Sequence, residues 1–315
     1  MKHRRRRRVR RYARLYSAIG AVIVAGGLAA WGLNGAPGLA SATGNHTGAT
    51  ASLRGPFRIS SGLTSAVPGL LAQSAAAKRA YQLKFDPGFP GNQIDTAIWN
   101  TCYPHENPLV GCQNFGQRQH EYEWYLPTQV LVSHGIVRLV AKKERTVGHD
   151  QFGHRKIYLC RSGMITTYPS FDFKYGIVQA VAKMHGAKGM WPALWLQAVK
   201  GWPPEVDMLE RWFSIGRPSA EFDHYAVPGQ TKPKRIAAWP VTVNLAVGWH
   251  TYTLVWTPSE LVWYIDGRVT LTANQHVPHE KMYFIADLAD SLPVVRGECS
   301  GALDLRSVKI WQNRS

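Results

Sequence analysis

The sequence has few acidic residues, and none of them lies near its N-terminus. Of 315 residues, 37 are Lys or Arg and 20 are Asp or Glu, which gives a formal net charge of +17. Residues 1–80 hold thirteen of the basic residues and no acid, so residues 81–315, with 24 basic and 20 acidic residues, carry only +4. Because the excess charge is confined to one end, the rest of the chain has an ordinary surface. We therefore expect no nucleic-acid partner.

Several patterns typical of metal or nucleophilic chemistry are also missing. The four cysteines form no C-x-x-C pair, and the twelve histidines show no metal-ligand spacing. There is no G-x-S-x-G, no H-E-x-x-H and no phosphate-binding glycine loop. These absences argue against a zinc enzyme, a serine hydrolase and a nucleotide-binding enzyme. No catalytic metal or cofactor is expected.

The longest apolar stretch is short for a membrane span. It covers the 17 residues 17–33 and follows a strongly basic start. Ala40-Ser41-Ala42 comes next, a small-residue pattern typical of cleavage, so we interpret residues 1–42 as a signal peptide. An N-terminal membrane anchor is the alternative, since 17 residues are at the lower limit for spanning a bilayer. Either way the rest is expected outside the cell, secreted or membrane-anchored.

Residues 43–80 are rich in Gly, Ser, Ala and Thr and contain no acid. Such a composition cannot bury enough apolar surface to fold. We interpret this segment as a disordered basic linker, through which the N-terminus could attach to a membrane or a cell wall. Residues 81–315 then remain as one folded domain.

Four cysteines in an exported domain predict disulfides. Cys102 and Cys112 are close enough in sequence for a local bond, which would leave Cys160 to pair with Cys299. Four cysteines allow three connectivities, so this pairing is a hypothesis. Buried free thiols are the alternative.

Beyond residue 80 the chain is a series of short segments with alternating apolar and polar residues. Examples are 136–142, 176–184 and 250–256. Asp266-Gly267, between two such segments, predicts a β-hairpin. No segment has the pattern of a long amphipathic helix. The chain is therefore predicted to be all-β, one large antiparallel β-sandwich or jelly roll. It is expected to be a monomer.

The segment W-P-P-E-V-D-M-L-E-R-W, residues 202–212, concentrates three acids. On a regular strand Glu205 and Asp207 share one face, and Glu210 points to the other. A β-bulge at Met208-Leu209 would return Glu210 to the face of the other two. We therefore predict a bulged strand that presents three carboxylates on a concave sheet.

Four tryptophans flank these acids: Trp191, Trp195, Trp202 and Trp212. Their flat apolar rings are surfaces on which sugar rings can stack, which favours a polysaccharide cleft over a solvated strand face. Two carboxyl groups about 5 to 5.5 Å apart are what a retaining glycosidase uses. Crowding of three acids raises at least one pKa, as a general acid requires.

The segment E-V-D-M-L-E resembles the E-[I/V]-D-x-x-E signature of glycoside hydrolase family 16. Similar stretches occur in the family's order at 162–167, 189–197 and 249–267, and the resemblance covers 81–315. It implies the family's curved jelly roll and retaining hydrolysis of an internal β-glycosidic bond. It also implies Glu205 as the nucleophile, Glu210 as the acid/base and Asp207 as the residue that tunes the nucleophile.

The resemblance supplies further candidates for substrate contact. His224 matches a family position near the acid/base, with an ordinary surface histidine as the alternative. Either Glu121 or Glu123 corresponds to a family glutamate that reaches the cleft. The tryptophans are candidates for sugar platforms, with core packing as the alternative. The candidate substrate-binding residues are Trp191, Trp202, Trp212, His224 and Glu123.

Some positions depart from the family pattern. Met164 stands where many members have Arg, and Asp287 stands where Asn is usual. The calcium-ligating Asp of the closing strand is replaced by Arg306, and Asp304 is displaced by two residues. These departures argue against a structural calcium ion and against transferring one particular glucan specificity.

The acids do not identify the sugar that is cleaved. The substrate is expected to be a β-1,3-glucan or a mixed-linkage glucan. A cell-wall transglycosylase is an alternative, because it differs only in the acceptor. A non-catalytic carbohydrate-binding jelly roll is another, which the three crowded acids disfavour because binding alone does not need them.

Overall fold

The computed structural model describes residues 80–103, 112, 121–149, 154–213, 219–230, 232–238, 245 and 248–314. All of them belong to one compact unit, Ala66–Ser315. The expected signal peptide or anchor at 1–42 lies outside the described residues, as does the expected linker except for Ala80. Within the described ranges, no helix is both long and apolar enough to cross a membrane.

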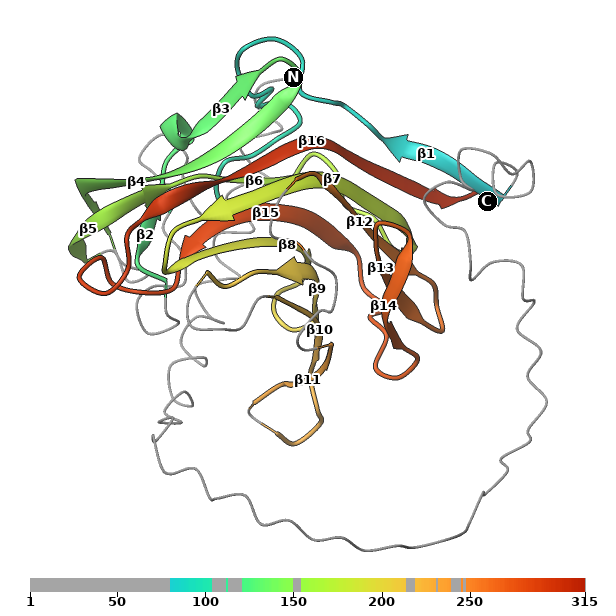
Figure 1. Cartoon of the computed structure of the whole chain (residues 1–315). Helices are drawn as coiled ribbons and strands as arrows, with labels where there is room; N and C mark the ends of the chain where they lie inside the picture. The colour runs from blue at the N-terminus through green and yellow to red at the C-terminus, as the bar shows by residue number, and fades with distance from the viewer. Residues whose placement is uncertain are drawn as a thin grey trace, which may run out of the picture. The chain divides into compact units, whose positions relative to one another are not determined.

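The domain consists of two packed β-sheets (Figure 1). The outer sheet contains β1 (Tyr81–Phe85), β2 (Glu123–Tyr125), β3 (Val130–Ser133), β4 (Ile136–His149), β5 (Arg155–Ser162), β7 (Gly176–Gly186), β12 (His250–Trp256), β13 (Leu261–Ile265), β14 (Arg268–Ala273) and β16 (Ser300–Asn313). Its strand order is β14-β13-β12-β7-β16-β4-β5-β2, with β1 on β16 and β3 on β4.

The inner sheet has six strands and carries the acid-rich segment. Its strand order is β11-β10-β9-β8-β15-β6. It contains β6 (Met164–Thr166), β8 (Met190–Ala198), β9 (Glu205–Glu210), β10 (Ala220–Tyr225), β11 (Lys234–Ala238) and β15 (Met282–Asp290). Apart from a single helical residue at Ala80, the described helical structure is one 3₁₀ turn, η3 (Pro127–Gln129).

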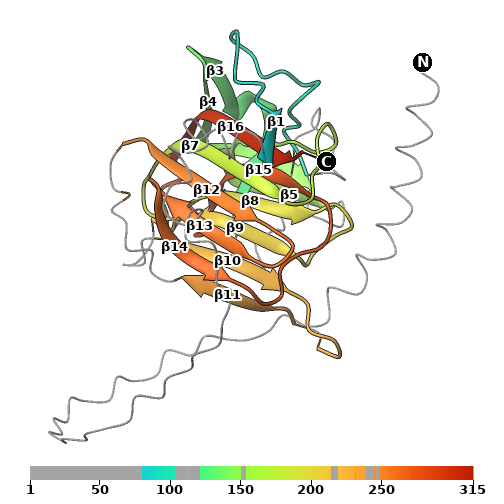
Figure 2. The same ribbon diagram turned by 90° about the vertical axis from the view of Figure 1, so that its right-hand side faces the viewer.

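These sheets confirm the predicted all-β sandwich. The described strand pairs are antiparallel except for β2 with β5. Both layers arch in the same direction in Figure 1, and Figure 2 shows their strands running in about the same direction. The curvature makes the inner sheet concave on the face that points away from the outer sheet, as the jelly roll requires.

The space between the sheets is filled by side chains that alternate along the strands. Leu194 and Leu196 of β8 and Phe284 of β15 are fully buried there, facing residues such as Val178 of β7. Burying a side chain of this size stabilises the fold by about 1.5 to 3 kcal/mol. This core fixes which face of each inner strand is turned to the cleft.

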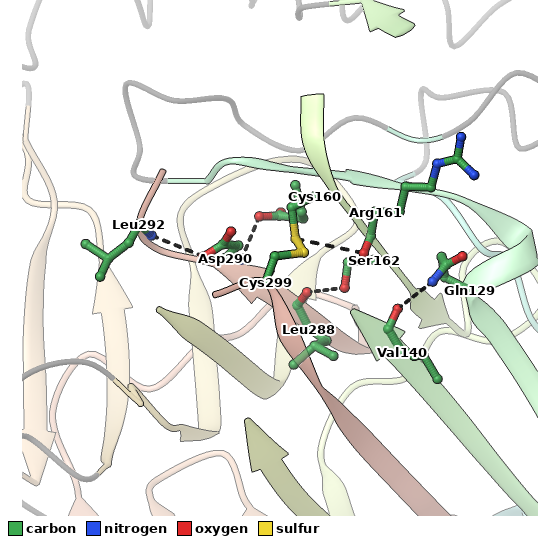
Figure 3. Close-up of a disulfide and its surroundings, with 10 residues drawn as sticks. Gln129, Val140, Cys160, Arg161, Ser162, Leu288, Asp290, Leu292 and Cys299 are labelled. Atoms are coloured by element: carbon green, nitrogen blue, oxygen red, sulfur yellow. Dashed lines mark hydrogen bonds between the residues drawn. A yellow bond between two sulfur atoms is a disulfide. The ribbon is translucent and has the colours of Figure 1, made fainter. Parts of the chain in front are cut away.

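Two local features also follow the sequence. Asp266 and Gly267 join β13 to β14 with φ angles of 49° and 79°, the left-handed conformation of a two-residue hairpin turn. Both expected disulfides, Cys102–Cys112 and Cys160–Cys299, are present. The second ties β5 to the residue before β16, and Figure 3 shows it beside Asp290.

Candidate active site

A β-bulge in β9 brings the three acids to one face. On the neighbouring β8, Trp195 pairs with Asp207 and Leu194 pairs with Leu209, which leaves Met208 as an extra residue. Met208 and Leu209 are both buried in the core between the sheets. Glu210 therefore turns back to the cleft face, and the predicted bulge is confirmed.

The three acids lie in a crowded, largely buried site. Burial and the negative charge of Asp207 raise the pKa of Glu205 to about 8. Burial and Asp287 raise the pKa of Asp207 well above its usual value. Burial, Asp207 and Glu205 do the same to the pKa of Glu210. The site therefore holds protons near neutral pH, as acid catalysis requires.

His224 of β10 lies against two of these acids. Its Nε2 atom is 3.2 Å from Asp207 Oδ2 and 3.5 Å from Glu205 Oε1. The pKa of His224 is lowered by burial, and the positive form of His224 lowers the pKa of Glu205. The sequence suggested a place near the acid/base, whereas these contacts put His224 beside the proposed nucleophile.

The flanking tryptophans lie at both ends of the row of acids. Trp191 and Trp212 are stacked, with ring centroids 5.3 Å apart, and the Trp191 indole lowers the pKa of Glu210. At the other end, the half-exposed Trp202 lowers the pKa of Glu205 through a hydrogen bond. Trp202 and the stacked pair thus lie on either side of the acids.

A fourth carboxylate, Asp287 of β15, lies beside the site on the same face of the sheet. Asp287 pairs with Ala193, which pairs in turn with Glu210, so the three lie in one row across the sheet. Asp287 Oδ1 accepts a hydrogen bond from Trp195 Nε1 (2.7 Å), and Oδ2 accepts one from the Tyr125 hydroxyl (2.9 Å). Burial raises the pKa of Asp287 to about 6.

The local sequence around Asp287 did not place it in the site. The only signal was its departure from the Asn that is usual at this position. Tyr125 was missed as well, and Trp195 was noted only as a flanking ring. These residues come from separate parts of the chain. Strand pairing brings Asp287 and Trp195 onto the sheet that carries the acids, whereas Tyr125, on β2 of the other sheet, reaches Asp287 through its hydroxyl.

Glu123, a candidate substrate contact, is buried at the end of β15. Its Oε2 atom accepts a hydrogen bond from the backbone N–H of Asp290 (2.6 Å). Asp290 lies next to the Cys160–Cys299 disulfide (Figure 3). Glu121 is buried too. The contact seen for Glu123 is therefore with the strand end and not with the three acids.

The residues that depart from the family pattern have other partners here. Met164 is buried against Trp195 in an aromatic cluster. Asp304 is buried, accepts two hydrogen bonds from Arg138 (2.6 and 2.9 Å) and lies within 4 Å of Lys183 and His185. A calcium ion at Asp304 would face these basic groups, so the residues do not fit one.

One corner of the described site has the composition of a metal site. Ligand atoms of Glu205, Asp207 and His224 lie within 4.8 Å of one another. These three groups could bind a divalent cation, which would compete with their part in glycoside chemistry. Cys160, Asp290 and Cys299 are equally close, but the two cysteines are bonded to each other.

Comparison with known proteins identifies relatives of this domain. The curated endo-1,3-1,4-beta-glycanases ExsH and EglC of Rhizobium meliloti (strain 1021) are 32% and 31% identical over 180 and 186 residues. Each match covers 54% of this chain and 37% of the relative. The chain thus spans little more than a third of the length of these relatives.

Solved structures share the fold at low sequence identity. The catalytic domain of an endo-1,3-beta-glucanase (laminarinase) from Thermotoga petrophila RKU-1 superposes with a TM-score of 0.59 at 22% identity, over 75% of this chain and 100% of that chain. Residues 118–288, more than half of the sequence, match the family described as Glycosyl hydrolases family 16. The chain belongs to Glycosyl hydrolases family 16.

Proposed function

We propose that this protein is an exported, retaining endo-β-glucanase that cleaves internal bonds of a polysaccharide by double displacement. The observation that carries the proposal is the bulge in β9, which gathers Glu205, Asp207 and Glu210 on one face. Tryptophans lie at both ends of this row, an arrangement that suits a chain of sugars passing across the acids.

In the first step, the ionised Glu205 attacks the anomeric carbon, and Glu210 donates its proton to the departing glycosidic oxygen. The C–O bond to the leaving chain breaks as the bond to Glu205 forms. In the second step, Glu210 removes a proton from water, whose oxygen attacks the anomeric carbon and releases Glu205. Two inversions at one carbon retain the β configuration.

Asp207 and His224 support the nucleophile in this scheme. The charge of Asp207 raises the pKa of Glu205, whereas protonated His224 lowers it. Burial makes the largest contribution, and together with these two charges it sets the pH at which Glu205 becomes ionised. Burial and two neighbouring acids oppose the ionisation of Glu210, so its pKa lies well above the usual value for a glutamate. The site can therefore hold one ionised and one protonated glutamate at once.

A β-1,3-glucan or mixed-linkage β-glucan is the proposed substrate. The relatives named as endo-1,3-1,4-beta-glycanases support it. A glucan endo-1,3-beta-glucosidase of Niallia circulans, 25% identical over 197 residues, supports it as well. We further propose that the protein works as a monomer outside the cell, either free or held at the surface by its N-terminal segment.

The test is release of reducing ends by the full chain from β-1,3-glucan, mixed-linkage glucan, agarose, carrageenan and β-galactan. We expect activity on one of the glucans, loss of it in Glu205→Gln, and retention in Glu144→Gln, whose carboxylate is bound to Arg161 and Lys142 on another sheet. Activity that survives in Glu205→Gln, or binding without cleavage, would contradict the proposal. Transfer to an added labelled oligosaccharide instead of water would point to a transglycosylase.

A further inference from the structure

The hairpin of β4 and β5 exposes three large apolar side chains on one face. Val147, Ile157 and Leu159 are 38%, 48% and 42% exposed. Val147 lies directly opposite Ile157 in the strand pairing, and Leu159 is two residues further along the same face. A contiguous exposed apolar surface with a polar rim is typical of an interaction site. We name these three residues the hairpin face.

The hairpin face belongs to a well-supported part of the sheet. Tyr158 and Cys160, which alternate with the exposed residues, are buried on the inner side. The Tyr158 ring packs on Trp124 at 4.9 Å, and the Cys160–Cys299 disulfide holds the base of β5. Figure 3 shows the Arg161 side chain pointing away from this disulfide. The exposed residues are therefore held outward by the packing beneath them.

Basic residues surround the hairpin face. In the described parts of the hairpin, 142–149 and 155–161, the only acid is Glu144, which is bound to Lys142 (2.8 Å) and Arg161 (2.7 Å). The basic residues of these two segments are Lys142, Lys143, Arg145, Arg155, Lys156 and Arg161. By the strand pairing, Lys142, Arg155 and Arg161 share the side of Ile157, whereas Lys143 and Lys156 are in register with the inward Cys160 and Tyr158. The combination of exposed apolar groups with a strong positive excess suits a partner that is anionic at its surface and apolar below it.

We propose that the hairpin face docks on an anionic lipid surface. Ile157, Leu159 and Val147 would enter the interface between headgroups and acyl chains, and the basic residues would contact phosphate. A second copy of the chain is a poor partner, because pairing two such hairpins would bring like charges together. Because the face lies on the outer sheet and points away from the core, docking would leave the acids of β9 on the opposite sheet accessible (Figure 1).

The experiment is hydrogen exchange of the full chain mixed with vesicles of phosphatidylglycerol or of phosphatidylcholine. The basic N-terminal segment is present in every sample, so the readout is local: exchange in peptides covering 155–161. We expect slower exchange there with phosphatidylglycerol only, and no change in the β13–β14 hairpin, 261–273. Raising the salt concentration should weaken the effect, because headgroup attraction is screened.

Variants distinguish docking from nonspecific attraction. The double variant Ile157→Ser, Leu159→Ser should need at least about ten times more phosphatidylglycerol vesicles for the same protection, because the apolar contact is lost. Val269→Ser, which alters an equally exposed residue on β14, should leave the protection unchanged. Equal exchange with both lipids, or full protection in the double variant, would overturn the proposal. So would the same protection from soluble poly(glycerol phosphate), which would identify an anionic polymer as the partner.

Discussion

Replacing Asp287 by Asn should move both limbs of the pH–rate profile to lower pH. Asp287 lies two strands from Glu210 in the same row of the sheet. Its negative charge raises the pKa values of Glu210, Asp207 and Glu205. Since burial raises the pKa of Asp287 itself only to about 6, the carboxylate is ionised where these glutamates titrate.

The size of the effect follows from the strand spacing. Two inter-strand steps separate Asp287 from Glu210 by about 10 Å. At an effective dielectric constant of about 20, the interaction is about 1.7 kcal/mol, or about one pH unit. Glu205 lies four residues further along the sheet, so its interaction is about half as large. Loss of the Asp287 charge favours ionisation of both glutamates. The alkaline limb, set by Glu210, should therefore shift to lower pH by about one unit, and the acidic limb, set by Glu205, by about half of that.

The assay is kcat/KM against pH on the glucan that the wild-type protein cleaves. In the wild type we expect the acidic limb near pH 8, where Glu205 ionises. Asn can still accept the Trp195 hydrogen bond and donate to the Tyr125 oxygen, so the geometry should survive. Tyr125→Phe is the control, because it removes a hydrogen bond to Asp287 but keeps the Asp287 charge. Neither limb should shift to lower pH in this variant. Unchanged or raised limbs in Asp287→Asn would refute the reasoning.

Three further predictions concern the frame of the site. Deleting Met208 should reduce activity at least about 100-fold, because Glu210 turns to the core, whereas Met208→Leu keeps the bulge and should stay active in the same assay. Opening the Cys160–Cys299 disulfide by Ser substitution should lower the free energy of unfolding by about 5 kcal/mol, and opening Cys102–Cys112 should lower it by about 3 kcal/mol, because the first disulfide closes the longer loop. Urea unfolding measures both losses, and equal losses would contradict this prediction. Burial raises the pKa of Asp223 to about 7, so its folded form keeps a proton that the unfolded chain loses, and stability should fall as pH rises from about 4 to 7. Asp223→Asn should therefore stabilise the protein by up to about 4 kcal/mol at pH 8 and not at pH 3, and a gain that does not depend on pH would argue against this origin.

The sequence predicted features whose cause is local. Alternation located β4, β7 and β12, and Asp266-Gly267 located the hairpin of β13 and β14, because only a few residues adopt its left-handed turn. The bulge followed from the spacing of Glu205 and Glu210 alone, because three acids on one face require an extra residue between them.

What was missed depends on pairing between distant strands. Asp287 is 77 residues beyond Glu210, and no local pattern indicates that β15 places it in one row with Glu210. His224 could be assigned to the cleft by resemblance, but only its pairing opposite Glu205 shows which acid it contacts.

The configuration of the first product tests the central claim most directly. Proton NMR recorded during the first minutes of glucan hydrolysis distinguishes the two anomers before they equilibrate. If Glu205 attacks the sugar and Glu210 activates water in a second step, the new reducing ends should appear as the β-anomer, with the α-anomer growing in later. An α-anomer formed first would mean a single displacement by water and would contradict the roles given to Glu205 and Glu210.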